Sequence, residues 1–92
     1  ITLVLFGSRT KTNHKKYSDW DIGAYHHNGI CHSEFSKLLL LKSDLEEKSP
    51  YFIDLVNLNL AEQDFLKEIS KSWIFITGSR QDWLELQKKA YS

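Results

Sequence analysis

Several residue types are scarce in this sequence, and each shortage excludes a class of structure. Cys31 is the only cysteine among 92 residues, which excludes an internal disulfide and indicates a reducing, cytoplasmic compartment. No apolar run approaches the roughly 18–20 residues that a membrane-spanning helix needs, so no membrane association is expected. A chain this short has room for one core, which predicts a single domain over residues 1–92.

An excess of either charge is missing as well. Twelve Lys and Arg residues balance twelve Asp and Glu residues, so the net charge is zero when the histidines are neutral. Such a chain produces no long-range field that would attract nucleic acid or an anionic membrane, and its net charge implies no nucleic-acid binding. Any bound anion must therefore be held by a local arrangement of residues.

Methionine is absent, and Ile1 already lies inside an apolar run that ends at Phe6. We therefore expect a further element before residue 1 that takes part in packing. The helices expected near residues 35–45 and 83–90 are rich in apolar side chains and should leave some of them exposed. Exposed apolar surface of this kind predicts a homodimer or a hetero-complex.

Hydrophobic periodicity predicts the elements of the domain. Apolar and alternating segments predict strands, and apolar residues at helical spacing predict helices. Strands are expected at residues 1–6, 20–26, 51–58 and 72–77, helices at 33–48, 61–69 and 80–91, and a short helical turn with an exposed loop at 9–18. This order predicts an α/β domain with a mixed sheet that helices cover mainly on one face.

Asp19 and Asp21 flank Trp20 at the start of the second expected strand. Residues two apart in a strand point to the same face, with Cα atoms roughly 6.5–7 Å apart. Two carboxylates this close repel each other unless a cation neutralises them. Mg²⁺ binds one or two carboxylates together with substrate phosphates, so the pair is a candidate metal site. The alternative is a solvated strand end or a helix cap.

Gly7, Ser8 and Arg9 follow the first expected strand. Glycine lets the backbone approach a phosphate closely, and Ser8 offers both its N–H and its hydroxyl to the same anion. Arg9 offers a bidentate contact to a phosphate. A Gly-Ser pair by itself is a common end to a strand, so this segment indicates a phosphate-binding site only in combination with the aspartates.

Asp54 is a third carboxylate, alone among apolar residues in the third expected strand. A carboxylate in this setting has three explanations: a strand edge, a buried structural partner, or a functional site. Beside Asp19 and Asp21 it would complete a metal pair or take the proton from an attacking hydroxyl.

Three segments together resemble the nucleotidyltransferase superfamily typified by DNA polymerase beta. They are Leu5-Phe6-Gly7-Ser8-Arg9, Ser18-Asp19-Trp20-Asp21-Ile22 and Phe52-Ile53-Asp54-Leu55-Val56. The chain is most similar to the minimal nucleotidyltransferases of bacteria and archaea, over roughly residues 3–78. It departs from them in two ways. Lys11-Thr12-Asn13 replaces a glycine that commonly follows the arginine, and Trp20 replaces an aliphatic residue.

The resemblance implies an activity and its cofactor. Asp19 and Asp21 would bind two divalent ions, Mg²⁺ or alternatively Mn²⁺, that also hold the phosphates of an NTP. Asp54 would bind one of these ions and help to deprotonate the acceptor, and residues 7–9 would hold the triphosphate. The expected reaction moves a nucleoside monophosphate, AMP from ATP, onto an acceptor hydroxyl.

The resemblance also implies a partner. Family members that lack a large second domain often pair with a small helical protein of the HEPN type in a toxin–antitoxin operon. The nucleotidyltransferase is then the antitoxin, and the acceptor can be a tyrosine of the toxin. The alternative is a catalytically weak or inactive subunit of the same fold that works by binding its partner protein. A small-molecule modifier of the aminoglycoside type is disfavoured, because such enzymes need more chain to build the acceptor pocket.

The remaining polar residues are given structural roles. His26, His27 and His32 fit the spacing of no standard zinc motif, and Cys31 is the only thiol near them, so no zinc site is predicted. The three tryptophans lie at core spacing, which favours packing over base stacking.

Overall fold

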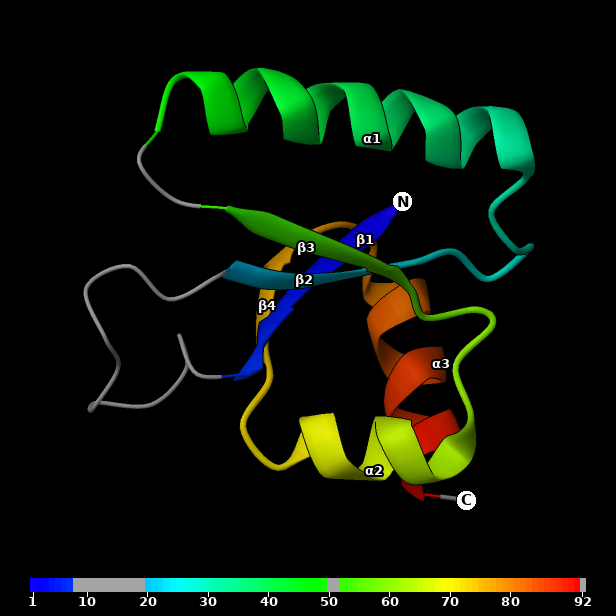
Figure 1. The fold of residues 1–92 in the computed structure, drawn as a ribbon. Helices are drawn as coiled ribbons and strands as arrows, with labels where there is room; N and C mark the ends of the chain where they lie inside the picture. Colours follow the sequence, from blue (N-terminus) through cyan, green and yellow to red (C-terminus); the bar gives the residue numbers. More distant parts are fainter. Residues whose placement is uncertain (8–19, 50–51, 92) are drawn as a thin grey trace.

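The computed structural model describes residues 1–7, 20–49 and 52–91. Seven elements lie within these residues, and Figure 1 shows their arrangement. In chain order they are β1 (Thr2–Phe6), β2 (Trp20–Tyr25), α1 (His32–Glu47), β3 (Ile53–Asn57), α2 (Gln63–Ser70), β4 (Ile74–Thr77) and α3 (Arg80–Tyr91). Each expected strand and helix is present, with ends within two residues of the prediction. The loop expected at 9–18 lies outside the described residues.

The strands form one mixed sheet in the order β3-β2-β1-β4. β1 pairs antiparallel with β2 and β4, whereas β2 and β3 run parallel. Parallel neighbours need a crossover connection, and α1 supplies it between β2 and β3. The predicted α/β class and the mixed sheet are therefore confirmed.

Residues of β1 alternate between the two faces of the sheet, as the pleat requires. Thr2, Val4 and Phe6 are buried on the face that α2 and α3 cover (Figure 1). The buried apolar cluster on this side consists of Val4, Phe6, Tyr25, Leu58, Leu66, Ile69, Leu86 and Ala90. The main core thus lies between the sheet and these two helices.

α1 forms a thinner layer over the opposite face (Figure 1). Its Leu38 and Leu41 line a space together with Leu3 and Ile22 of the sheet, but no residue of α1 is buried. Leu40 remains 68% exposed, so this helix leaves apolar surface uncovered, as expected. Although α1 is 16 residues long, no helix of the described part of the chain could cross a membrane.

α3 buries a different face from the one expected at its first turn. Leu86 and Ala90 are buried as predicted, but Leu84 was expected to face inward and is 47% exposed. Asp82 takes the inward position, with only 1% exposure. Asp82, Leu86 and Ala90 are spaced four residues apart, so they share one helix face. In the first turn, Asp82 accepts hydrogen bonds from Thr2 of β1 and from His27, which follows β2. These hydrogen bonds account for the burial of the aspartate.

Candidate active site

Asp21 and Asp54 lie side by side in the sheet. Each is the second residue of its strand, β2 or β3, and the parallel register pairs their Cα atoms directly. Neighbouring strands lie roughly 4.8 Å apart, and paired residues point to the same face. The fold therefore brings together two of the predicted site residues that are far apart in the sequence. Asp54 is exposed and Asp21 is half-buried, so a ligand can reach both.

Gly7 follows β1 and lies directly against Asp21. Its φ is +80°, in the left-handed region that favours glycine. A Cβ built on Gly7 would lie 3.0 Å from Cγ of Asp21 and closer still to its Oδ2. A residue with any side chain would therefore push this carboxylate out of place. The glycine predicted to lie beside a phosphate thus also leaves room for Asp21, a carboxylate of the predicted metal pair.

The chemistry of this donor set suits a divalent cation. Carboxylate oxygens are the ligands that Mg²⁺ prefers, and two of them stand in register on one face of the sheet. Their mutual repulsion is relieved when a cation binds between them. Asp19, Ser8 and Arg9, the other predicted site residues, lie outside the described residues, and their roles remain predictions.

A second polar cluster, at the other end of β2, was missed by sequence reasoning. His26, His27 and Asp82 place potential metal-ligand atoms within 4.8 Å of one another. Asp82 Oδ1 accepts hydrogen bonds from the His27 backbone N–H (2.9 Å) and from its ring Nδ1 (2.8 Å), and Oδ2 accepts one from the Thr2 hydroxyl (3.1 Å). Burial opposes ionisation of Asp82, but these hydrogen bonds outweigh it and lower its pKa.

Both oxygens of Asp82 already accept hydrogen bonds. We therefore interpret this cluster as a structural contact that holds α3 against β1 and the end of β2, and not as a metal site. An aspartate in the first turn of a helix is ordinarily an exposed acid that favours the positive end of the helix dipole. The position of Asp82 in the first turn of a helix therefore did not predict its burial.

Solved structures share this fold over almost the whole chain. A chain of a toxin–antitoxin complex crystallised with AMP-PNP matches with a TM-score of 0.67 and 22% identity, covering 98% of this chain and 68% of that one. A mutant of the toxin–antitoxin pair MntA-HpeT matches with a TM-score of 0.69 and 22% identity, covering 98% of this chain and 71% of that one.

A third match is a complex of tri-AMPylated Shewanella oneidensis HEPN toxin with MNT antitoxin, with a TM-score of 0.65, 22% identity, and coverage of 98% of this chain and 66% of that one. At such identities the likeness shows the fold alone. None of the curated proteins compared with the chain matches it significantly. The family model described as "Polymerase beta, Nucleotidyltransferase" matches residues 1–82. The chain therefore belongs to the polymerase beta-type nucleotidyltransferase family.

Proposed function

We propose that this protein is a metal-dependent nucleotidyltransferase that moves AMP from ATP onto an acceptor hydroxyl. The observation that carries this proposal is the pairing of Asp21 with Asp54 in register, with Gly7 packed against the first of them. Two carboxylates this close repel each other, and a bound divalent cation would relieve that repulsion.

Each residue has a role in the proposed reaction. Asp19, Asp21 and Asp54 would hold two divalent ions, Mg²⁺ or Mn²⁺, and residues 7–9 would bind the triphosphate. Such ions would supply positive charge that offsets the negative charge of the phosphates and of the transition state. The acceptor oxygen attacks the α-phosphorus, Asp54 accepts the hydroxyl proton, and pyrophosphate leaves.

We propose further that the acceptor belongs to a HEPN-type toxin and that the protein acts as the cytoplasmic antitoxin of such a pair. This rests on the family and on the shared fold with chains of toxin–antitoxin complexes. Incubation with the product of the neighbouring gene, Mg²⁺ and α-labelled ATP should place one or more labels on that product. No transfer from folded, nucleotide-binding protein would refute the assignment of this acceptor.

The active site itself can be tested without an acceptor. Calorimetric titration of ATP in the presence of Mg²⁺ should show binding to the wild type and none to the double variant Asp21→Asn/Asp54→Asn. Asp44→Asn is the matched control, because this exposed aspartate lies on α1, away from the site. Equal binding by the wild type and the double variant would show that these carboxylates hold no metal-bound nucleotide.

A second candidate is a non-catalytic subunit that works by binding its partner. The exposed leucines of α1, such as Leu40 and Leu41 (68% and 59% exposed), favour a protein-binding role. Under this reading, Asp21→Asn/Asp54→Asn would still neutralise the toxin in cells. Loss of neutralisation in that variant, with the complex still formed, would exclude it.

A further inference from the structure

β3 is an edge strand of the sheet that the described residues form, and its hydrogen bonds to β2 determine which of its backbone groups point outward. The N–H of Trp20 donates to the C=O of Phe52 (2.8 Å), and the N–H of Leu58 donates to the C=O of Ala24 (2.8 Å). In a parallel ladder the bonding residues of a strand alternate, so even-numbered residues of β3 bond to β2. The N–H and C=O groups of Ile53, Leu55 and Asn57 therefore face away from the sheet.

Two of these six outward groups are already bonded within the chain. The N–H of Ile53 donates to Glu46 Oε2 (2.8 Å), and the C=O of Asn57 accepts from the N–H of Leu60 (3.2 Å). The described residues provide no partner for the C=O of Ile53, for the N–H and C=O of Leu55, or for the N–H of Asn57. These four groups are consecutive along the outer edge of β3, so one added strand could pair with them. The bonded N–H of Ile53 and the bonded C=O of Asn57 mark the two ends of this pairing site.

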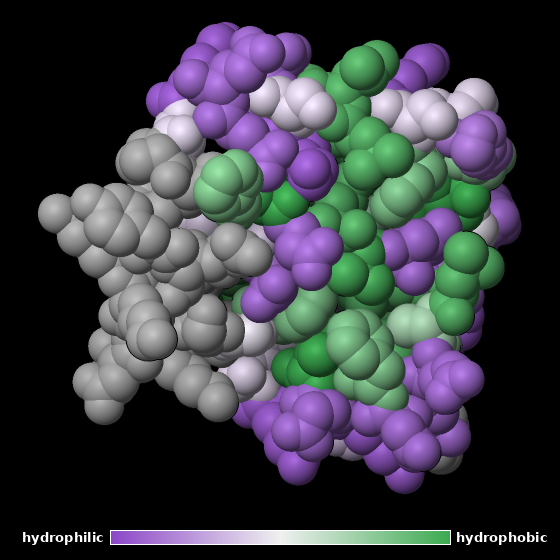
Figure 2. Space-filling view, in the orientation of Figure 1, coloured by the Kyte–Doolittle hydropathy of each residue, from purple (hydrophilic) through white to green (hydrophobic). Residues whose placement is uncertain are grey.

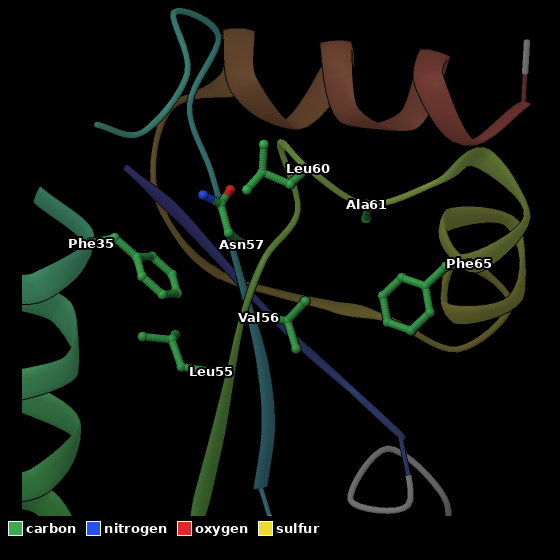
Figure 3. A pocket seen from close by; sticks show the side chains of 7 residues that line it. All are labelled: Phe35, Leu55, Val56, Asn57, Leu60, Ala61 and Phe65. Carbon is green, nitrogen blue, oxygen red and sulfur yellow. The ribbon is translucent and has the colours of Figure 1, made fainter. Parts of the chain in front are cut away.

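Apolar side chains line this edge on both sides. Phe35 of α1 and Leu55 lie on one side of β3, and Val56 and Phe65 of α2 lie on the other (Figure 3). Together with Leu60 they border an open space of about 600 Å³ along the outer edge of the strand. Figure 2, drawn in the orientation of Figure 1, shows apolar residues gathered across the middle of the molecule. A strand paired here would have apolar contacts for its side chains on both faces.

The same edge carries Asp54 of the candidate site. Residues paired on neighbouring strands share a face, and their Cβ atoms lie roughly 4.5–5.5 Å apart. A side chain on an added strand opposite Asp54 would therefore stand beside its carboxylate, on the face that Asp21 shares. A hydroxyl at that position is within reach of the proton acceptor.

We propose that the acceptor is a protein segment that binds in extended conformation as a fifth strand along β3, with a Ser, Thr or Tyr residue opposite Asp54. This rests on the proposed function. The hydroxyl oxygen forms a bond to the α-phosphorus of ATP, the bond from that phosphorus to pyrophosphate breaks, and the hydroxyl proton passes to Asp54 and then to solvent. The neighbours of the hydroxyl residue point to the other face, against Phe35 and Leu55.

The test uses pools of nine-residue synthetic peptides with a fixed central Tyr, Ser or Thr, incubated with the full chain, Mg²⁺ and α-labelled ATP. Labelled peptides should be enriched in apolar residues immediately before and after the hydroxyl residue. N-methylation of alternate amides of the best peptide then tests for strand pairing. One alternate set should lower labelling on the order of fivefold per hydrogen bond lost, and the other set should have no effect. A peptide held only by apolar contacts would show no such alternation, which would overturn the proposal.

Two exposed leucines provide matched variants. Leu60→Asp places a charge in the open space beside β3 and should lower peptide labelling at least tenfold, while Leu84→Asp on the exposed side of α3 should not. Leu60 and Leu84 are 82% and 47% exposed, so neither change should unfold the protein. Equal labelling by both variants would overturn the proposed binding edge.

Calorimetry separates failure of this inference from failure of the proposed function. Wild-type protein that binds Mg²⁺ and ATP but labels no peptide, while labelling a folded partner, would overturn the extended acceptor and leave the transferase activity standing. Absence of nucleotide binding would overturn both. A dimer in sedimentation that protects the Leu55 and Asn57 amides from hydrogen exchange would assign the edge to a second copy of the chain instead.

Discussion

Replacement of Gly7 by alanine should damage the site far more than it damages the fold. Gly7 has a φ of +80°, and an L-residue in this region costs about 1–2 kcal/mol of stability. The added Cβ would also lie 3.0 Å from Cγ and 3.3 Å from Cβ of Asp21. The carboxylate must then retreat by about 1 Å, and displacement of a reacting group by that distance costs on the order of a hundredfold in rate.

Gly29→Ala is the control that separates these two effects. Gly29 has nearly the same φ, +83°, but an added Cβ there would meet nothing within 4 Å. Urea denaturation should give a similar backbone cost of about 1–2 kcal/mol for both variants, with any further loss in Gly7→Ala due to the clash with Asp21. Calorimetry with Mg²⁺ and ATP should show weakened binding in Gly7→Ala alone.

A Gly7→Ala variant that binds Mg²⁺ and ATP with wild-type affinity and loses no more stability than Gly29→Ala would refute this prediction. That result would mean that Asp21 can move without consequence, and it would remove the link between Gly7 and the metal site.

Three further changes test the packing of the fold. Leu86→Ala should lower the free energy of unfolding by about 2–5 kcal/mol, because Leu86 is fully buried, whereas Leu84→Ala on the exposed side of α3 should change it little in the same urea titration. Thr2→Val removes a hydrogen-bond donor from buried Asp82 and should cost about 1–3 kcal/mol; an unchanged midpoint would contradict this. Because burial is outweighed by hydrogen bonds from His27 and Thr2, the pKa of Asp82 is lowered in the folded state. Its stabilisation is therefore present above the unfolded-state pKa and lost as pH falls through the folded-state value, below about pH 4; Asp82→Asn should abolish this part of the acid slope in thermal unfolding.

Local patterns were sufficient to predict the elements. The apolar run of β1, the alternation of β2 and the helical spacing of Leu86 and Ala90 all depend on neighbours in the sequence. Because such interactions involve nearby residues only, the sequence contains the information that they need.

Burial at element ends could not be predicted in the same way. Asp82 is buried because Thr2 and His27, which lie 80 and 55 positions away, donate hydrogen bonds to it. Without those partners a buried aspartate would be unstable, so the pattern of the helix favours Leu84 as the inward residue. The leucines of α1 were likewise read as a helix face, but the extent to which the sheet covers them depends on how the layers pack.

The sequence by itself determined which residues carry the candidate chemistry: a glycine after one strand, and aspartates in the next two. It determined the family as well, because the spacing of these segments is characteristic of it. Only the tertiary structure decided that Asp21 and Asp54 are paired in register and that Gly7 lies against the first of them. It also decided that β3 is an edge strand whose outward backbone groups adjoin the site. Register depends on the hydrophobic pattern of both paired strands together with the geometry of their connections. Edge position depends on which strands pair, so neither can be read from the residues of one strand alone.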